Sequence, residues 1–171
     1  MALRLLRVPT LNPARSFRSI VANLVPVISH LKNYPSHSFS EHLARKGSGR
    51  FTHSLRVGYL SFSLAMLTRC DPFTCARAGV LHDAGYDAEN LASPLKQLLS
   101  HAERGAKLAA SIGEPRAVVE AIKTHMFPLG SPPRTREALI VWIADKFDAL
   151  LELIGLTRIL NKLVLRLLEA Y

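Results

Sequence analysis

Four histidines and two aspartates recur along the sequence at intervals that favour a shared metal site. The six residues are His53, His82, Asp83, His101, His125 and Asp145. The first histidine precedes the His-Asp pair by 29 residues, and the later intervals are 18, 24 and 20 residues, each about one helix and its loop. A helical bundle brings side chains from facing helices to one interior point, where histidine and carboxylate sites hold metal ions. The spacing therefore predicts that these side chains meet inside a bundle.

Helix signals along the chain support this bundle. Asp71-Pro72 and Ser93-Pro94 each combine an N-cap residue with proline at the first helical position. Gly113 follows a helical segment, as glycine commonly does at helix ends. No sustained alternation of apolar and polar residues predicts a strand, so the expected fold class is all-α. The predicted helices cover 24–31, 51–68, 72–85, 94–112, 115–126, 135–154 and 157–171, with the first beginning or kinked near Pro26.

Length and composition indicate a single domain. The 171 residues, 49% of them apolar, suffice for one ordinary hydrophobic core. We divide the chain into a basic N-terminal arm with leading helices (1–46), a helical core (47–155) and an amphipathic C-terminal helix (156–171). That last helix is expected to pack on the core, although its leucine-rich face (159–168) also suits a homodimer.

Basic residues are concentrated near the N-terminus. Residues 1–50 hold eight of the 22 lysines and arginines but one acid, Glu41, whereas the rest of the chain is nearly neutral. This argues against a nucleic-acid surface spread over the domain, although the arm itself offers a contact for nucleic acid or anionic lipid. Arginine and serine without acids also fit an organellar transit peptide, but a basic helix packed on the domain is the simpler interpretation.

Two further features bear on the compartment. No run of 18 uninterrupted apolar residues exists, so the sequence predicts no transmembrane segment. Cys70 and Cys75 lie five positions apart, which fits neither a disulfide framework nor a zinc-binding CxxC pair. A reducing, cytoplasmic location is therefore expected.

The order of the candidate ligands also carries a family resemblance. The first histidine, the His82-Asp83 doublet and the final aspartate follow the order H…HD…D, and residues 50–150 resemble the HD-domain metal-dependent phosphohydrolases. His101 and His125 are similar to the two extra histidines of dinuclear members. The resemblance implies an HD-domain helical bundle with six ligands for two metal ions. The stretches HAERGAKLAASIG and AIKTHM look like a small bacterial subgroup that includes diadenosine tetraphosphate hydrolases.

Such a ligand set suits hydrolysis. Imidazole and carboxylate groups favour Fe, Mn, Ni, Co or Zn, and Mg is compatible with the carboxylates. Asp83 is the carboxylate best suited to bridge two ions while His82 binds one of them. Two ions about 3.5–4 Å apart lower the pKa of a bridging water and clamp phosphoryl oxygens during in-line attack. No serine or cysteine nucleophile is then required.

Two cations are candidates for substrate contact. Arg56 follows His53 by three positions on the same helix face, so we expect it to bind a phosphate beside the metals. Lys146, next to Asp145, points about a quarter-turn away and is a second candidate. The expected substrate is a phosphomonoester or phosphodiester, with a nucleotide favoured.

Two alternatives remain open beside a phosphohydrolase that uses a metal-activated water. One is a non-catalytic, nucleotide-binding regulatory module, although a decayed site usually lacks at least one ligand. The other is a di-iron oxygenase, because a similar six-ligand arrangement serves both chemistries. Iron content and oxygen dependence would identify this second alternative.

Overall fold

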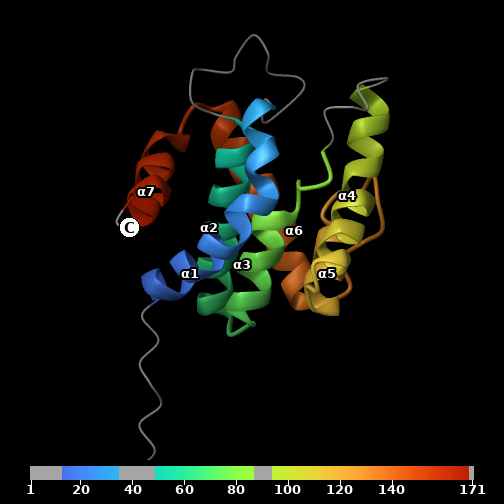
Figure 1. Cartoon of the computed structure of the whole chain (residues 1–171), viewed down its shortest axis with the longest axis horizontal. Coiled ribbons are helices and arrows are strands. Elements are labelled where there is room, and N and C mark those ends of the chain that lie inside the picture. The colour runs from blue at the N-terminus through green and yellow to red at the C-terminus, as the bar shows by residue number, and fades with distance from the viewer. Residues whose placement is uncertain (1–12, 35–48, 87–93, 170–171) are drawn as a thin grey trace, which may run out of the picture.

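The computed structural model describes residues 13–34, 49–86 and 94–169, and its elements over these ranges are helices (Figure 1). They are α1 (Pro13–Ile28), the short 3-10 helix η1 (Ser29–Asn33), α2 (Arg50–Thr68), α3 (Pro72–Leu81), α4 (Pro94–Ser111), α5 (Arg116–Thr124), α6 (Arg136–Leu153) and α7 (Thr157–Glu169). The prediction of an all-α bundle is confirmed. None of the helices in the described ranges combines the length and apolar character needed to cross a bilayer.

Helices α2 and α3 form the closest pair in the bundle, and two glycines make that approach possible. A Cβ atom on Gly79 would lie 2.9 Å from the Cα atom of Gly58 on the facing helix. A Cβ atom on Gly58 would lie 2.4 Å from Cγ2 of Val80. Because both positions lack side chains, the two backbones touch, and the histidines that these helices carry come close together.

The remaining helices close the bundle around this pair. Helix α6 packs against α2, α3 and α5, and α4 packs against α5 (Figure 1). The turn after α3 lies directly against α4, since a Cβ atom on Gly85 would clash with the backbone oxygen of His101. This contact sets the distance between the end of α3 and the middle of α4.

Side-chain caps begin two of the helices, at Asp71 as predicted and at Thr135, whereas the predicted cap Ser93 lies outside the described residues. The Asp71 carboxylate accepts hydrogen bonds from the backbone N–H groups of Phe73 and Thr74 at 3.1 and 3.2 Å. Thr135 caps α6 by accepting from the N–H of Ala138 at 3.1 Å. Each cap satisfies a donor that the first helical turn leaves free, so the cap residues determine where these helices begin.

The first helix differs from its prediction. Helix α1 begins at Pro13, well before the expected segment, and Pro26 lies inside its last turn. Its buried residues are Phe17, Ile20, Val21, Leu24 and Ile28, which form one continuous apolar face. Burial of that face stabilises the helix despite the one backbone hydrogen bond that proline removes. The other parts of the predicted N-terminal arm, residues 1–12 and 35–46, lie outside the described residues.

Helix α7 packs back against α1, α2 and α6. Its Val164 and Thr157 are buried, and the Nε–H group of Arg18 on α1 donates to the backbone oxygen of Leu167 at 2.6 Å. The opposite face of α7 exposes apolar side chains, including Ile159, which is 82% exposed. One side of this amphipathic helix therefore belongs to the bundle.

Candidate metal centre

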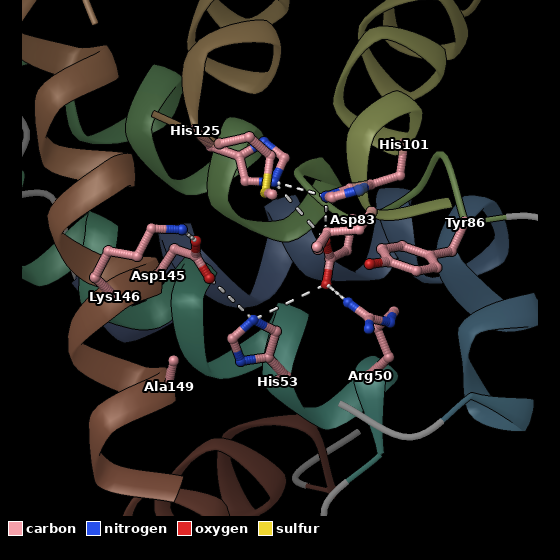
Figure 2. A pocket seen from close by; sticks show the side chains of 11 residues that line it. Arg50, His53, Asp83, Tyr86, His101, His125, Asp145, Lys146 and Ala149 are labelled. Atoms are coloured by element: carbon pink, nitrogen blue, oxygen red, sulfur yellow. Dashed lines mark hydrogen bonds and ion pairs between the residues drawn. The ribbon is translucent and has the colours of Figure 1, made fainter. Parts of the chain in front are cut away.

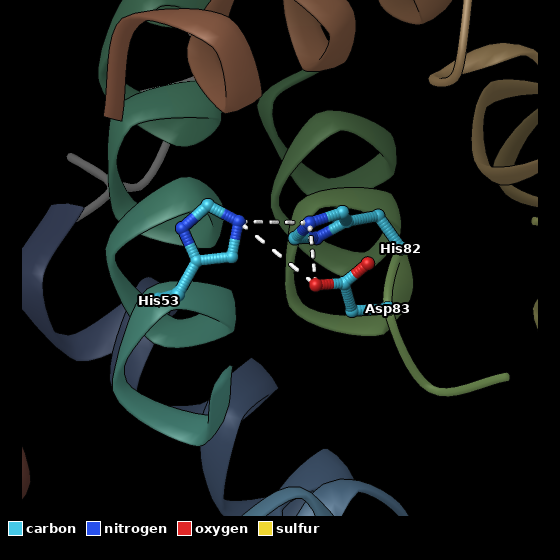
Figure 3. A group of neighbouring side chains, drawn as sticks. All are labelled: His53, His82 and Asp83. Atoms are coloured by element: carbon cyan, nitrogen blue, oxygen red, sulfur yellow. Dashed lines mark hydrogen bonds and ion pairs between the residues drawn. The ribbon is translucent and has the colours of Figure 1, made fainter. Parts of the chain in front are cut away.

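The bundle brings all six candidate ligands to one interior point, as the helix spacing predicts. They come from α2, the end of α3, α4, the end of α5 and α6, and each residue is at most 6% exposed. Figure 2 shows five of them around one cavity, and Figure 3 shows His53 beside the His82-Asp83 doublet. Three overlapping groups of three side chains place ligand atoms within 4.8 Å of one another. This convergence is what a metal site requires.

Asp83 lies between two pairs of histidines and offers a different oxygen to each. Its Oδ2 atom lies 4.0 Å from Nε2 of His53 and 3.5 Å from Nε2 of His82. Its Oδ1 atom lies 3.3 Å from Nε2 of His101 and 3.9 Å from Nε2 of His125. A carboxylate placed in this way is suited to bridge two cations, one beside each histidine pair.

Asp145 completes one side of this arrangement. Its Oδ1 atom lies 3.2 Å from Nε2 of His53 and 3.6 Å from Nε2 of His82. Its Oδ2 atom accepts a hydrogen bond from Nζ of Lys146 at 2.7 Å. The pair formed by His53 and His82 therefore has both Asp83 and Asp145 beside it. Of these two carboxylates, Asp83 is the one that lies beside the pair formed by His101 and His125.

The Nδ1 atoms of the four histidines face acceptors, which determines the direction of the other ring nitrogen. Nδ1 of His82, His101 and His125 donates to the backbone oxygens of Gly79, Gln97 and Ile122 at 2.7, 3.1 and 2.6 Å. Nδ1 of His53 donates to Oδ2 of Asp148 at 2.7 Å. Because carbonyl and ionised carboxylate oxygens only accept, each Nδ1 carries the proton and each Nε2 is directed at the centre.

Two of these histidines depend on helix ends for their placement. His82 and His125 directly follow α3 and α5, and each donates to a carbonyl in the last turn of its own helix. Carbonyls in a last helical turn lack their regular helical partner. The His82 ring bonds to the Gly79 oxygen, and the Ile122 oxygen accepts from both the ring and the backbone N–H group of His125. The partial negative charge at these two helix ends also favours a cation nearby.

The electrostatics of the site match a cation at its centre. Burial opposes ionisation of Asp83, but the Arg50 guanidinium and the neighbouring histidines outweigh it and hold the pKa of the carboxyl well below its usual range. Burial is also outweighed at Asp145, mainly by the His53 hydrogen bond, so the pKa of that carboxyl is likewise lowered. Burial lowers the pKa of His125 to about 3, with His82 and His101 adding to the effect. Two ionised carboxylates thus face a neutral imidazole.

The pKa of His53 is changed by the carboxylates around it. Burial disfavours its charged form, but hydrogen bonds to Asp145 and Asp148 outweigh burial and raise its pKa to about 10. The Nε2 atoms of His53 and His82 lie 3.3 Å apart, and those of His101 and His125 lie 3.0 Å apart. Since each Nδ1 already donates elsewhere, a proton or a metal ion between the two Nε2 atoms would stabilise each close pair. These residues fit divalent metal ions.

A cavity of about 240 Å³ opens onto this centre. The cationic side chains of Arg50 and Lys146 line it together with the aromatic ring of Tyr86 (Figure 2). Nη1 of Arg50 donates to Oδ2 of Asp83 at 2.5 Å, and the guanidinium stacks 3.5 Å from the centroid of the Tyr86 ring. The buried Nε–H group of Arg50 has no hydrogen-bond partner among the residues that the structure describes. The positive charge of the Arg50 guanidinium at the cavity favours an anion there.

Arg56 differs from its predicted role as a phosphate contact. Its side chain is fully buried and does not line the cavity. Its Nε and Nη2 atoms donate to Asp148 at 2.8 Å each, and Nη1 donates to Asn161 at 2.7 Å. Helices α6 and α7 cover this end of the helix face, so the guanidinium is sealed inside the protein. Lys146 lines the cavity.

Two residues of the site were missed from the sequence. Arg50 lies three positions before His53 and therefore shares its helix face, but it was counted only among the eight basic residues of 1–50. Asp148 lies three positions after Asp145, one turn along α6. In both cases helical spacing from an already identified ligand was the available signal.

Comparisons with known proteins agree with this geometry. The chain is 35% identical to ribonuclease Y of Borreliella afzelii over 103 residues, which cover 60% of this chain and 19% of that protein. It is 34% identical to ribonuclease Y of Thermus thermophilus over 103 residues, which cover 60% of this chain and 17% of that protein. The chain thus matches less than a fifth of the length of these relatives.

A solved structure shares the fold. The HD domain of the phosphodiesterase PgpH from L. monocytogenes, in complex with cyclic-di-AMP, aligns with a TM-score of 0.50 and 14% sequence identity. The alignment covers 88% of this chain and 81% of that domain. The family model described as HD domain matches residues 50–150, the range that contains the His53, His82-Asp83 and Asp145 ligand order. This chain is therefore a member of the HD domain family, as its sequence resemblance predicts.

Proposed function

We propose that this protein is a metal-dependent phosphohydrolase that cleaves a phosphomonoester or phosphodiester of a nucleotide. The observation that carries the proposal is the position of Asp83 between two histidine pairs beside a cavity that also holds Arg50. Ribonuclease Y and the phosphodiesterase PgpH, both similar to this chain, cleave phosphoesters according to their names, which supports the same reaction class.

The six ligands have distinct roles in this proposal. His53, His82 and Asp145 would hold one divalent ion, His101 and His125 would hold a second, and Asp83 would bridge them. Bound there, the ions would supply a hydroxide nucleophile at neutral pH and neutralise charge on the phosphoryl oxygens. The backbone oxygens behind the histidines keep their Nε2 atoms directed at the ions.

Residues of the cavity would bind and orient the substrate. Arg50 would present its positive charge to a phosphoryl oxygen, and its stacking on Tyr86 restricts the guanidinium to one plane. Lys146 lies at the cavity edge, with its ammonium on Asp145 and 42% of its side chain exposed. It would meet a phosphate that enters from solvent.

A second hollow adjoins the metal cavity and supports a substrate with an organic group. This hollow of about 160 Å³ shares Leu98 and Met126 with the metal cavity and is also lined by Leu99 and Leu129. Glu103, Lys123 and Ser131 also line this hollow, so it offers both apolar side chains for the ring faces of a nucleotide base and polar groups for hydrogen bonds. The phosphodiesterase domain that shares the fold was solved with a cyclic dinucleotide, which also favours nucleotides here.

The first test is metal content per chain, measured by mass spectrometry on untagged protein purified without chelators. The proposal expects about two equivalents of metal and hydrolysis in a screen of nucleotide phosphoesters with Mn, Fe, Ni, Co, Zn or Mg supplied. Iron together with substrate-dependent oxygen uptake would instead identify an oxygenase. Absence of metal after reconstitution, with nucleotide binding retained, would identify a regulatory module.

A further inference from the structure

A buried network of charged and polar side chains lies behind the metal centre, outside the cavity. Asp148 on α6 is fully buried and does not line the cavity. Its Oδ2 atom accepts from Nδ1 of His53 at 2.7 Å and from Nη2 of Arg56 at 2.8 Å, and its Oδ1 atom accepts from Nε of Arg56 at 2.8 Å. Arg56 in turn donates to Oδ1 of Asn161 on α7 at 2.7 Å. The network therefore runs from a candidate metal ligand to the last helix.

His53 is held differently from the other three histidines. Those three donate to backbone oxygens three or four positions earlier in the chain, so the helical backbone orients them locally. His53 instead donates to the side chain of Asp148, which lies 95 positions away on another helix. Its ring orientation consequently depends on how α6 packs against α2, and on whatever holds the Asp148 carboxylate still.

Arg56 holds that carboxylate with paired hydrogen bonds. The fork of Nε and Nη2 bonds to both oxygens of Asp148, a geometry that restricts rotation of the carboxylate. Arg56 itself is held at its other end by Asn161 and by Oε2 of Glu152 at 3.3 Å. A buried ion pair adds little net stability compared with well-packed apolar residues, so its main effect is on geometry.

We propose that Asp148 is a positioning residue for His53, and that Arg56 and Asn161 hold it, which makes helix α7 a support of the metal centre. This proposal rests on the proposed function, because it takes His53 to be a ligand of a metal ion. It also explains why an arginine one turn from a ligand is sealed inside the protein rather than exposed to the cavity. The chemistry at the metal would involve none of these three side chains directly.

The test compares the parent protein with Asp148→Asn, which keeps the side-chain size but weakens the acceptor. Loss of such a support typically lowers metal affinity about 10- to 100-fold, and we expect that loss for Mn or Zn in a chelator competition titration. Proton–nitrogen NMR reports the hydrogen bond itself, because a strongly bonded Nδ1 proton on His53 resonates far downfield. We expect this signal to move upfield in the variant, in metal-free as well as zinc-loaded protein.

Variants further along the network and a matched control complete the design. Asn161→Leu, on α7, should shift the same His53 signal and lower metal affinity by a smaller factor, and it remains informative if Asp148→Asn does not fold. Arg77 and Glu114 form a similar arginine–carboxylate pair with bonds of 2.7 and 2.5 Å, neither lining the metal cavity. Glu114→Gln should lower thermal stability and leave metal affinity unchanged.

The outcomes separate this inference from the proposed function. Unchanged metal affinity and an unchanged His53 signal in both network variants would overturn the positioning role. A parent that binds no metal would contradict the proposed function, and the His53 signal in metal-free protein would still decide whether Asp148 orients the ring. Equal losses of metal affinity in Glu114→Gln and Asn161→Leu would also overturn the inference, because general destabilisation would then explain them.

Discussion

Nε2 of His101 and Nε2 of His125 lie 3.0 Å apart in the interior of the bundle, although 24 positions separate them in the sequence. Both rings donate from Nδ1 to backbone oxygens, so at most one proton is available for the space between them. The Oδ1 atom of Asp83 lies beside both rings, at 3.3 and 3.9 Å. A single carboxylate thus lies beside this pair and also beside the pair formed by His53 and His82.

Removal of the Asp83 charge should therefore affect metal binding at both histidine pairs. We expect Asp83→Asn to bind fewer metal ions per chain and to lose more than about 100-fold of any hydrolytic activity, because an amide bridges cations poorly. Metal content by mass spectrometry and far-ultraviolet circular dichroism would be measured together. Asp71→Ala provides the control, since loss of this helix cap should cost about 1 kcal/mol of stability without changing metal content. Full metal content in Asp83→Asn would exclude a bridging role.

The metal-free protein should be most stable near neutral pH. His125 has a pKa of about 3 when folded, below its ordinary value of 6.5, so its contribution is complete above pH 6.5 and declines as the pH falls toward 3. His53 has a folded pKa of about 10, so its contribution is complete below pH 6.5 and declines as the pH rises toward 10. Each group changes the unfolding free energy by up to about 1.4 kcal/mol per pH unit within its window.

Urea unfolding of chelator-treated protein between pH 5 and 9 would measure both slopes. His125→Gln should reduce the slope on the acidic side, where His82 keeps part of it because burial lowers its pKa as well. His53→Gln should reduce the slope on the alkaline side. A stability curve that stays flat across this range in the parent protein would show that neither imidazole is perturbed as described.

Arg50 and Arg56 should respond differently to the same substitution. Arg50→Lys keeps the charge but removes the planar fork and the stacking on Tyr86, so we expect the KM for a phosphoester to rise about tenfold with metal content unchanged. The inhibition constant of inorganic phosphate should rise in parallel. Arg56→Lys should instead lower metal affinity, because Arg56 contacts Asp148 and not the cavity. If Arg56→Lys raised the KM and Arg50→Lys lowered metal affinity, Arg56 would be the phosphate contact that the sequence predicts.

The second hollow, beside the metal cavity, should contribute to substrate choice. Leu129 lines this hollow and is 59% exposed, so Leu129→Ser removes apolar contact area without disturbing the core. We expect the KM for a nucleotide to rise about threefold to tenfold, while hydrolysis of a phosphoester of a small alcohol stays unchanged. Leu67→Ser, at an exposed position outside both hollows, should change neither. If Leu129→Ser affected the nucleotide and the small phosphoester equally, the hollow would not be part of the nucleotide-binding site.

The contact between α2 and α3 should be sensitive to a single methyl group. A Cβ atom on Gly79 would lie 2.9 Å from the Cα atom of Gly58 and 3.0 Å from the backbone oxygen of Val57. We expect Gly79→Ala to lower the unfolding free energy by about 1–3 kcal/mol, since two helix backbones would have to separate. Gly130→Ala is the control, because its nearest neighbour would lie 3.7 Å away. Similar unfolding midpoints for the two variants would contradict the close packing.

Much of the helical framework could be read from local sequence. Asp71-Pro72 and Thr135 begin α3 and α6 through side-chain caps, which depend on nearest neighbours alone. The start of α1 at Pro13 could not be read in this way, because the burial of Phe17 and its apolar neighbours against the bundle determines how far that helix extends. Local signals therefore defined caps better than they defined the extent of the first helix.

The sequence by itself determined which residue types and which helices supply the candidate ligands, since the histidine and aspartate intervals match successive helices. Only the tertiary structure decided which arginine faces the cavity. Arg50 and Arg56 lie three positions before and after His53, so helical periodicity places both on the same face. Helices α6 and α7 cover the end that carries Arg56, whereas Arg50 lines the open cavity. Periodicity specifies a face of a helix, but the packing of distant segments specifies which part of that face remains accessible.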